Sequence, residues 1–159
     1  NILAQDLLER ILKKDPGFFE ALVIKLLVAM GYGGSLNEAA GMVVGKSGDE
    51  GIDGIIKEDK LGLDNIYIQA KRWNNVVERP EVQKFVGALA GKGATKGIFI
   101  TTSSFSRGAR EFKPQNNIKI VLIDGNQLCE YMIDYNIGVF TANTFEVKRI
   151  DIDFFESEE

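Results

Sequence analysis

Asp53, Gln69 and Lys71 are the residues of this sequence whose types and spacing best suit catalysis. Two β-rich runs flank the short polar segment 58–64, a pattern typical of a β-hairpin. If the turn is symmetric about Leu61, antiparallel pairing places Asp53 directly across from Gln69, with Lys71 one step further along the same face. The sequence therefore predicts a carboxylate, an amide and an ammonium group on one side of a sheet.

The hydrophobic pattern of the two runs supports this register. Side chains alternate between the faces of a strand, so a shift of one residue would move the isoleucines off the core. The set predicted to face the core is Ile52, Gly54 and Ile56 in the first run, with Ile66, Ile68 and Ala70 in the second.

This group of side chains suits phosphodiester hydrolysis. The oxygens of Asp53 and Gln69, with the backbone carbonyl of Ala70, are hard ligands of the kind that Mg²⁺ prefers. A bound metal polarises the phosphate and acidifies a water, while Lys71 can orient that water and stabilise the developing charge. The pattern alone is weak, and it also fits an Asp–Lys pair on a solvated sheet face, which is worth at most about 1 kcal/mol.

Composition limits the classes of protein. The 159 residues are enough for one domain with a sizeable core, and no apolar run approaches the roughly 20 residues that span a bilayer. The absence of histidine excludes a histidine base, a His-containing triad and His-ligated zinc. Cys129 is the only cysteine, so no internal disulfide can form, and we expect a cytoplasmic protein.

Charge is unevenly distributed along the chain. The net charge is −4, yet residues 57–119 hold 12 Lys and Arg against 6 Asp and Glu, while both ends are acidic. A basic middle is consistent with a surface that binds nucleic acid, and also with scattered charge on a solvated surface.

The remaining pattern predicts an α/β domain with a central mixed β-sheet and helices on both faces. Helical periodicity or start signals mark 2–14, 16–30, 79–90, 107–112 and 126–135, and β-rich runs mark 41–45, 96–102 and 118–123. Residues 35–40 suit a short helix or a loop, and 138–155 suit a β-hairpin or an extended segment with an acidic end.

The run Gly48–Gly54, together with Gln69-Ala70-Lys71-Arg72-Trp73, resembles the catalytic domain of Mrr-type restriction endonucleases in the PD-(D/E)xK nuclease superfamily. The resemblance covers about residues 15–150 and implies a restriction-endonuclease-like core. It further implies that 1–14 is a leading helix after a separate N-terminal winged-helix domain, that 15–150 is the catalytic domain, and that 151–159 is an acidic tail. Other matching stretches are Phe19-Glu20, Met30-Gly31-Tyr32, Phe85–Leu89, Ile98–Thr102, Ala109-Arg110-Glu111 and Leu122–Gly125.

The resemblance assigns catalytic roles to Asp53, Gln69, Lys71 and Glu20. It implies a Mg²⁺ ion, which Mn²⁺ can replace, held by Asp53, Gln69 and the Ala70 carbonyl. Glu20 then lies behind these ligands or binds a second metal. By itself, Glu20 suits an acid placed near the start of a helix to complement its dipole.

Two positions depart from the superfamily's usual pattern. Gln69 replaces a carboxylate, a variant typical of the Mrr branch, which lowers the negative charge available to a metal. Glu50 stands where the branch usually has glycine. It is either an extra acid beside the site or a harmless surface change, and we favour the surface change.

The implied activity is that of a type IV restriction endonuclease, which cleaves methylated foreign double-stranded DNA. The partner is then DNA, held through its phosphates by Lys84, Lys92, Arg107 and Arg110. Cutting both strands also implies a homodimer. Two alternatives remain open: a repair or recombination nuclease of the same fold, and a DNA-binding module that does not cleave.

Overall fold

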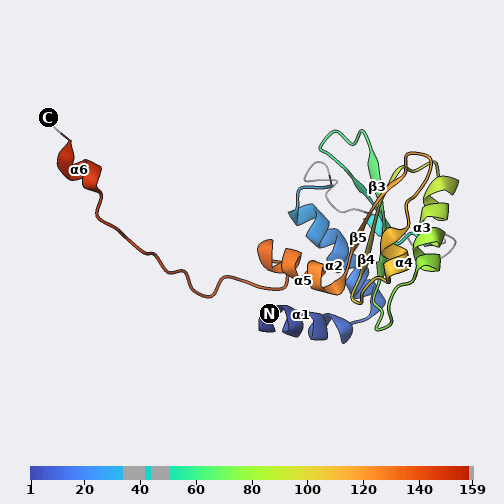
Figure 1. The fold of residues 1–159 in the computed structure, drawn as a ribbon, viewed down its shortest axis with the longest axis horizontal. Coiled ribbons are helices and arrows are strands. Elements are labelled where there is room, and N and C mark those ends of the chain that lie inside the picture. Colours follow the sequence, from blue (N-terminus) through green and yellow to red (C-terminus); the bar gives the residue numbers. More distant parts are fainter. Residues whose placement is uncertain (34–41, 44–50, 158–159) are drawn as a thin grey trace.

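The computed structural model describes residues 1–33, 42–43 and 51–157, and within them the chain forms a mixed α/β domain (Figure 1). A five-stranded sheet has the order β1-β2-β3-β4-β5. The strands are β1 (Met42–Val43), β2 (Gly54–Lys57), β3 (Asn65–Lys71), β4 (Lys96–Thr101) and β5 (Lys119–Ile123). The helices are α1 (Ile2–Leu12), α2 (Pro16–Ala29), α3 (Arg79–Gly91), α4 (Arg107–Glu111), α5 (Gly125–Asp134) and α6 (Ile152–Glu156).

The sheet changes direction at β3. Strands β1, β2 and β3 pair antiparallel, whereas β3, β4 and β5 pair parallel. Helices α3 and α4 return the chain between the parallel strands, as such crossovers require. Gly54 pairs with Ile68, so the hairpin is symmetric about Leu61 and the predicted register is confirmed.

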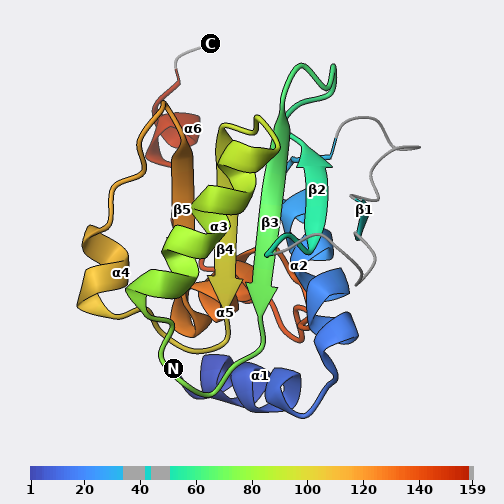
Figure 2. The same cartoon turned by 90° about the vertical axis from the view of Figure 1, so that its right-hand side faces the viewer.

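Helices cover both faces of the sheet, as predicted. Figure 2 shows α3 over one face and α2 with α5 behind the other. Behind the sheet, Ile56, Ile66, Ile68 and Ala70 pack with buried residues of α1, α2 and α5; we call this the first core. Under α3 lies a second core, built around the edge-to-face rings of Phe85, Phe99 and Phe105.

Local signals explain where helix α2 begins and why it is buried. Asp15 caps it by accepting a hydrogen bond from the Phe18 N–H at 2.7 Å, and Pro16 occupies the first turn. Its apolar residues lie all round the helix, so it has almost no polar face and packs against the sheet.

Ile52 contradicts the predicted alternation. It belongs to the second core, whereas Ile56 belongs to the first. The reason is that β2 begins only at Gly54: the Asp53 N–H donates to the carbonyl of Ile68 at 2.7 Å, and the strand alternation does not extend back to Ile52.

The C-terminal segment forms no hairpin. Residues 139–150 are extended without pairing to any described strand, and Asp151 then caps the short helix α6. The chain therefore leaves the domain as a single arm (Figure 1).

Some expectations lie outside the described residues: the segment 35–40, the flanks of β1, and Glu50. None of the helices described is long and apolar enough to cross a membrane.

Candidate active site

Asp53 and Gln69 meet at the end of the β2–β3 hairpin. Asp53 Oδ2 accepts two hydrogen bonds of 2.7 Å, from Gln69 Nε2 and from the Ala70 N–H. Gln69 is 3% exposed, which is unusual for a glutamine, and its burial is compensated by this bond. The structure thus brings together the carboxylate and the amide that the register predicted.

Lys71 completes the group on the same strand. Its Nζ lies 5.0 Å from the centroid of the Trp73 ring, within cation–π range. Its positive charge also acts on the Asp53 carboxylate and lowers the pKa of that group. The ammonium therefore lies over an aromatic ring and near enough to Asp53 for its charge to act on that carboxylate.

The environment of Asp53 disfavours its own negative charge. Burial raises the pKa of Asp53 above its ordinary value and outweighs the Ala70 N–H and Lys71, both of which lower it. A carboxylate in this situation gains more than an exposed one from a nearby cation. Such shifts are common at functional sites.

Three oxygens near Asp53 are of the chemical type that a hard divalent cation prefers. No hydrogen bond among the described residues uses Asp53 Oδ1. In a strand, the N–H and C=O of one residue point to the same side. The Ala70 N–H donates to Asp53, so the Ala70 carbonyl also points to the side where Asp53 lies. Strand β2 begins only at Gly54, after Asp53. Gln69 bonds through its nitrogen, and its Oε1 lies beside Gly51, where an added Cβ would be 3.2 Å away.

The donor set contains few acidic side chains. In the part of the chain that the structure describes, no group of three or more His, Cys, Asp or Glu could hold a metal.

Glu20 lies half-buried in the second turn of α2. Figure 2 shows that α2 begins at the end of the sheet where β3 ends. Arg72, directly after β3, donates from Nη1 to the carbonyl of Leu12 at 3.2 Å and joins this strand to the α1–α2 junction. The helix places Glu20 at the correct end of the sheet, and its role near a metal stays a prediction.

Thr101 and Thr102 support the site, and the sequence did not single them out for it. Thr101 Oγ1 donates to the carbonyl of Lys71 at 2.9 Å, and Thr102 Oγ1 donates to the carbonyl of Trp73 at 2.8 Å. Both residues are buried and fix the backbone on either side of Arg72. The signal available in the sequence was a threonine pair at the end of an apolar strand.

The four predicted phosphate-binding residues do not form one cluster. Arg107 pairs with Glu111 at 2.7 Å, and Arg110 pairs with Asp124 at 2.9 Å. Lys92 follows α3 and precedes β4, so it lies at the opposite end of the parallel strands from Lys71. Lys84 is exposed on α3. Contacts of these residues with DNA stay predictions.

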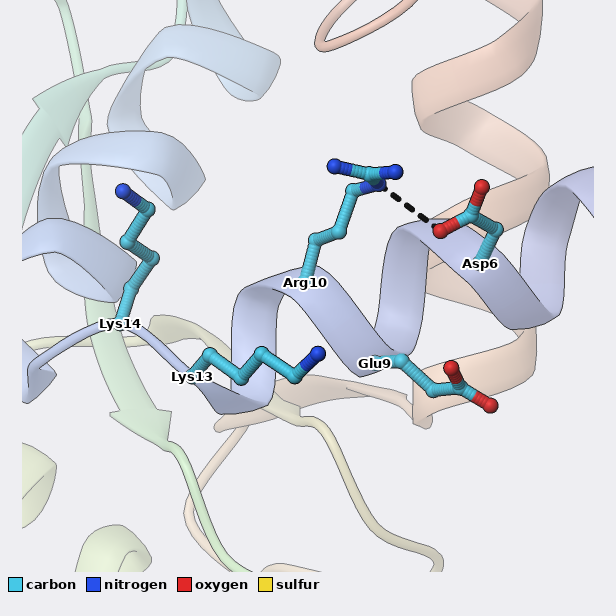
Figure 3. A pocket seen from close by; sticks show the side chains of 5 residues that line it. All are labelled: Asp6, Glu9, Arg10, Lys13 and Lys14. Atoms are coloured by element: carbon cyan, nitrogen blue, oxygen red, sulfur yellow. Dashed lines mark hydrogen bonds and ion pairs between the residues drawn. The ribbon is translucent and has the colours of Figure 1, made fainter.

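Two surface hollows lie near this end of the sheet. One, of 420 Å³, is lined by Arg72, Trp73, Asn74 and Asn75 directly beyond Lys71. The other, of 390 Å³, runs along the last turns of α1 and is lined by the residues shown in Figure 3: Asp6, Glu9, Arg10, Lys13 and Lys14. Arg10 is paired with Asp6 at 2.8 Å, so the second hollow is of mixed charge.

The fold is that of restriction endonucleases. The DNA modification-dependent restriction endonuclease AspBHI superposes with a TM-score of 0.65 at 20% identity, over 87% of this chain and 36% of that one. The MspJI restriction endonuclease, solved in complex with a 27-mer oligonucleotide, superposes with a TM-score of 0.60 at 25% identity, over 85% of this chain and 33% of that one.

The chain belongs to the Mrr_cat restriction endonuclease family, whose model matches residues 11–132. The type IV methyl-directed restriction enzyme EcoKMrr of Escherichia coli (strain K12) is 46% identical to it over 154 residues. This match covers 97% of the chain and 49% of the relative, so the chain spans about half the length of that protein. The predicted family and fold are confirmed.

Proposed function

We propose that this chain is the cleavage domain of a methyl-directed type IV restriction endonuclease and that it hydrolyses DNA phosphodiester bonds with Mg²⁺. The observation that carries the proposal is the hydrogen-bonded unit of Asp53, Gln69 and Ala70 beside Lys71. Membership of the Mrr_cat family and the 46% identity to EcoKMrr support the substrate class.

Asp53, Gln69 and the Ala70 carbonyl would hold the cation, with Glu20 behind them or at a second metal. When bound, Mg²⁺, or Mn²⁺ in its place, would polarise the scissile phosphate and acidify a water. The Gln69–Asp53 hydrogen bond orients the carboxylate, and the Ala70 N–H holds it against the strand.

Lys71 acts on the reacting phosphate in this proposal. Trp73 and the Asp53 charge restrict where its ammonium can lie. A fixed cation at this point orients the attacking water and stabilises the charge that develops on the phosphate oxygens.

DNA is the proposed partner, and phosphate contacts by Lys84, Lys92, Arg107 and Arg110 provide affinity without reading bases. Recognition of the methylated base belongs to a separate N-terminal winged-helix domain, to which residues 1–14 lead. Cleavage of both strands is assigned to a homodimer in the cytoplasm.

Plasmid nicking tests the proposal. The chain is incubated with supercoiled DNA in Mg²⁺ or in EDTA, beside Asp53→Ala, Lys71→Ala and the control Lys25→Ala, which changes an exposed lysine of α2. We expect cleavage with Mg²⁺ and none with EDTA. Both site variants should cleave at least about 100-fold more slowly than the unmodified chain, and the control should cleave at the same rate as that chain. Circular dichroism checks that all variants are folded.

Matched duplexes test the substrate class. The full-length protein is given methylated, unmethylated and branched DNA of the same sequence, and we expect preference for the methylated duplex. Preference for the branched substrate would favour a recombination nuclease instead.

In the nicking experiment, the catalytic assignment is wrong if Lys71→Ala cuts as fast as the unmodified chain.

A further inference from the structure

The C-terminal arm, residues 140–157, exposes many large apolar side chains. Helix α6 contains no buried residue, and Figure 1 shows the arm running away from the domain. Exposed apolar surface of this extent marks an interaction site in a folded protein. The side chains concerned are each between 61% and 90% exposed: Phe140, Phe145, Val147, Ile150, Ile152, Phe154 and Phe155.

The arm has the sequence of a β-strand without a partner. Apolar and polar residues alternate through Thr144–Lys148, with an aromatic and a β-branched residue at the apolar positions. The segment before α6 is already extended, yet it pairs with no described strand.

The base of the arm is fixed to its own domain. The Ile137 N–H donates to the carbonyl of Met132 at 2.9 Å, and Ile137 and Val139 pack against the first core. Gly138 turns the chain with a φ of +73°, a conformation that favours glycine. The direction in which the arm leaves is therefore set by the fold.

Strand β5 offers a matching edge. It is the edge strand of the sheet next to β4, and no described segment pairs with its outer side. Val121, in the middle of this strand, is 54% exposed. An open edge of this kind accepts an added strand through backbone hydrogen bonds.

Charge favours contact of the end of the arm with this edge. Residues 151–159 hold five acidic and no basic residues, whereas the extended part, 140–150, holds one acidic and two basic residues. Lys119, the first residue of β5, and Lys113, in the segment between α4 and β5, are exposed and form no ion pair with the described residues, in contrast to Arg107 and Arg110 on α4. The acidic end of an arm laid along this edge would supply the missing partners.

We propose that the arm of each chain adds as a strand to the β5 edge of a second copy, so that two chains exchange arms. Eleven extended residues, 140–150, reach about 36 Å at roughly 3.3 Å per residue. That length is comparable to the width of a domain of this size, whose radius of gyration is about 14 Å. The arm can thus cross one face of a neighbour.

The buried area would be sufficient for a stable dimer. Phenylalanine side chains bury about 150–250 Å² each, and each arm carries four of them. Two reciprocal arms, with their aliphatic residues, therefore reach the roughly 1,600 Å² of a standard interface.

The match to EcoKMrr leaves only five residues of the chain uncovered, so it extends well into the arm, whereas the family model ends at residue 132.

This inference supplies the homodimer that the proposed function calls for. Association is measured here without DNA or metal, so its failure leaves the nuclease chemistry standing, and failure of the chemistry leaves the dimer standing.

Sedimentation equilibrium of the unmodified chain should show a dimer. The arm variant Phe145→Asp/Val147→Asp and the edge variant Lys113→Glu/Lys119→Glu should each raise the dimer dissociation constant about tenfold or more. The control Lys25→Glu reverses an exposed charge on α2 and should leave it unchanged. All the substituted side chains are exposed, so the domain should keep its melting temperature.

Two further measurements identify the contact. Adding Asp153→Lys/Glu156→Lys to the edge variant should restore dimerisation, because the opposite charges face each other again. Benzoylphenylalanine at Phe145, in a mixture of isotopically light and heavy chains, should crosslink to peptides around β5 of the other isotope. A monomeric chain, crosslinks confined to one chain, or a dimer unaffected by the arm variant would each overturn the proposal.

Discussion

The Asp53 carboxylate is held where its charge is unfavourable. Because burial raises its pKa in the folded protein, the contribution of this group to stability is present below the ordinary pKa of an aspartate, and it is lost as the pH rises through the raised value. At neutral pH the metal-free domain therefore carries an unfavourable charge at its site. A loss of stability of this kind is common at functional sites.

Replacing Asp53 by asparagine should separate stability from activity. The asparagine oxygen can still accept from Gln69 Nε2 and the Ala70 N–H, while the charge is removed. We expect no cleavage, and a melting temperature a few degrees higher than that of the unmodified chain at neutral pH without metal. The gain should shrink as the pH falls through the raised pKa of Asp53 and be absent below the ordinary pKa of an aspartate. Thermal unfolding at several pH values checks this, and a lower melting temperature at neutral pH would contradict it.

Gln69→Glu restores the carboxylate of the superfamily pattern and should have the opposite effect. Without metal, the variant loses the Nε2 donor to Asp53 and brings two carboxylates together, which should cost about 1–3 kcal/mol. A divalent cation relieves that repulsion, so Mg²⁺ should raise the melting temperature of the variant more than that of the unmodified chain. Gln83→Glu, exposed on α3, is the matched control. Equal Mg²⁺ effects in the variant and the unmodified chain would argue against Gln69 as a metal ligand.

At the scale of the elements, the site depends on how closely α5 approaches the end of β4. Gly125, the first residue of α5, donates its N–H to the carbonyl of Ser103 at 2.9 Å. A Cβ added there would lie 2.2 Å from the carbonyl oxygen of Thr102, which is backbone and cannot rotate away. Thr102 in turn holds the carbonyl of Trp73 beside Lys71.

Gly125→Ala should therefore lower both stability and cleavage. Moving Thr102 to make room should cost about 1–3 kcal/mol of unfolding free energy and loosen the end of β3. Gly87→Ala is the control: this glycine lies inside α3 with no atom within 4 Å of an added Cβ, and alanine should stabilise the helix by about 0.5–1 kcal/mol. Urea unfolding measures both variants. Equal stability of Gly125→Ala and the unmodified chain would mean that α5 shifts freely.

Elements with local signals were predictable from the sequence, and those that depend on distant partners were not. Proline at the starts of α2 and α3 marked both helices, and the symmetry about Leu61 placed Asp53 opposite Gln69. The bonds from Thr101 and Thr102 reach back about 30 residues along the chain, and no local pattern reports them. The arm has the pattern of a strand, but a strand also requires a partner, which its own domain does not provide.

Across the whole molecule, the sheet separates two cores, and the candidate site lies where the sheet ends at the α1–α2 junction. The Arg72 bond to Leu12 joins the strand that carries Lys71 to the C-terminal end of α1. The first core includes residues of α1, α2 and α5 as well as the central strands. It therefore links both ends of the domain sequence to the strand that carries Lys71.

Cys129, buried in α5 within this first core, reports on the integrity of the domain as a whole. Burial raises the pKa of its thiol to about 11, so the reactive thiolate is scarce at neutral pH, and the side chain is only 1% exposed. Reaction with a disulfide reagent such as DTNB should require the first core to open. A Lys60→Cys variant adds an exposed thiol in the β2–β3 turn as an internal reference. We expect that thiol to react immediately and Cys129 at least about 1,000-fold more slowly, at a rate that rises with urea in parallel with global unfolding. Rapid labelling of Cys129 in the native chain would show instead that α5 opens independently of the sheet.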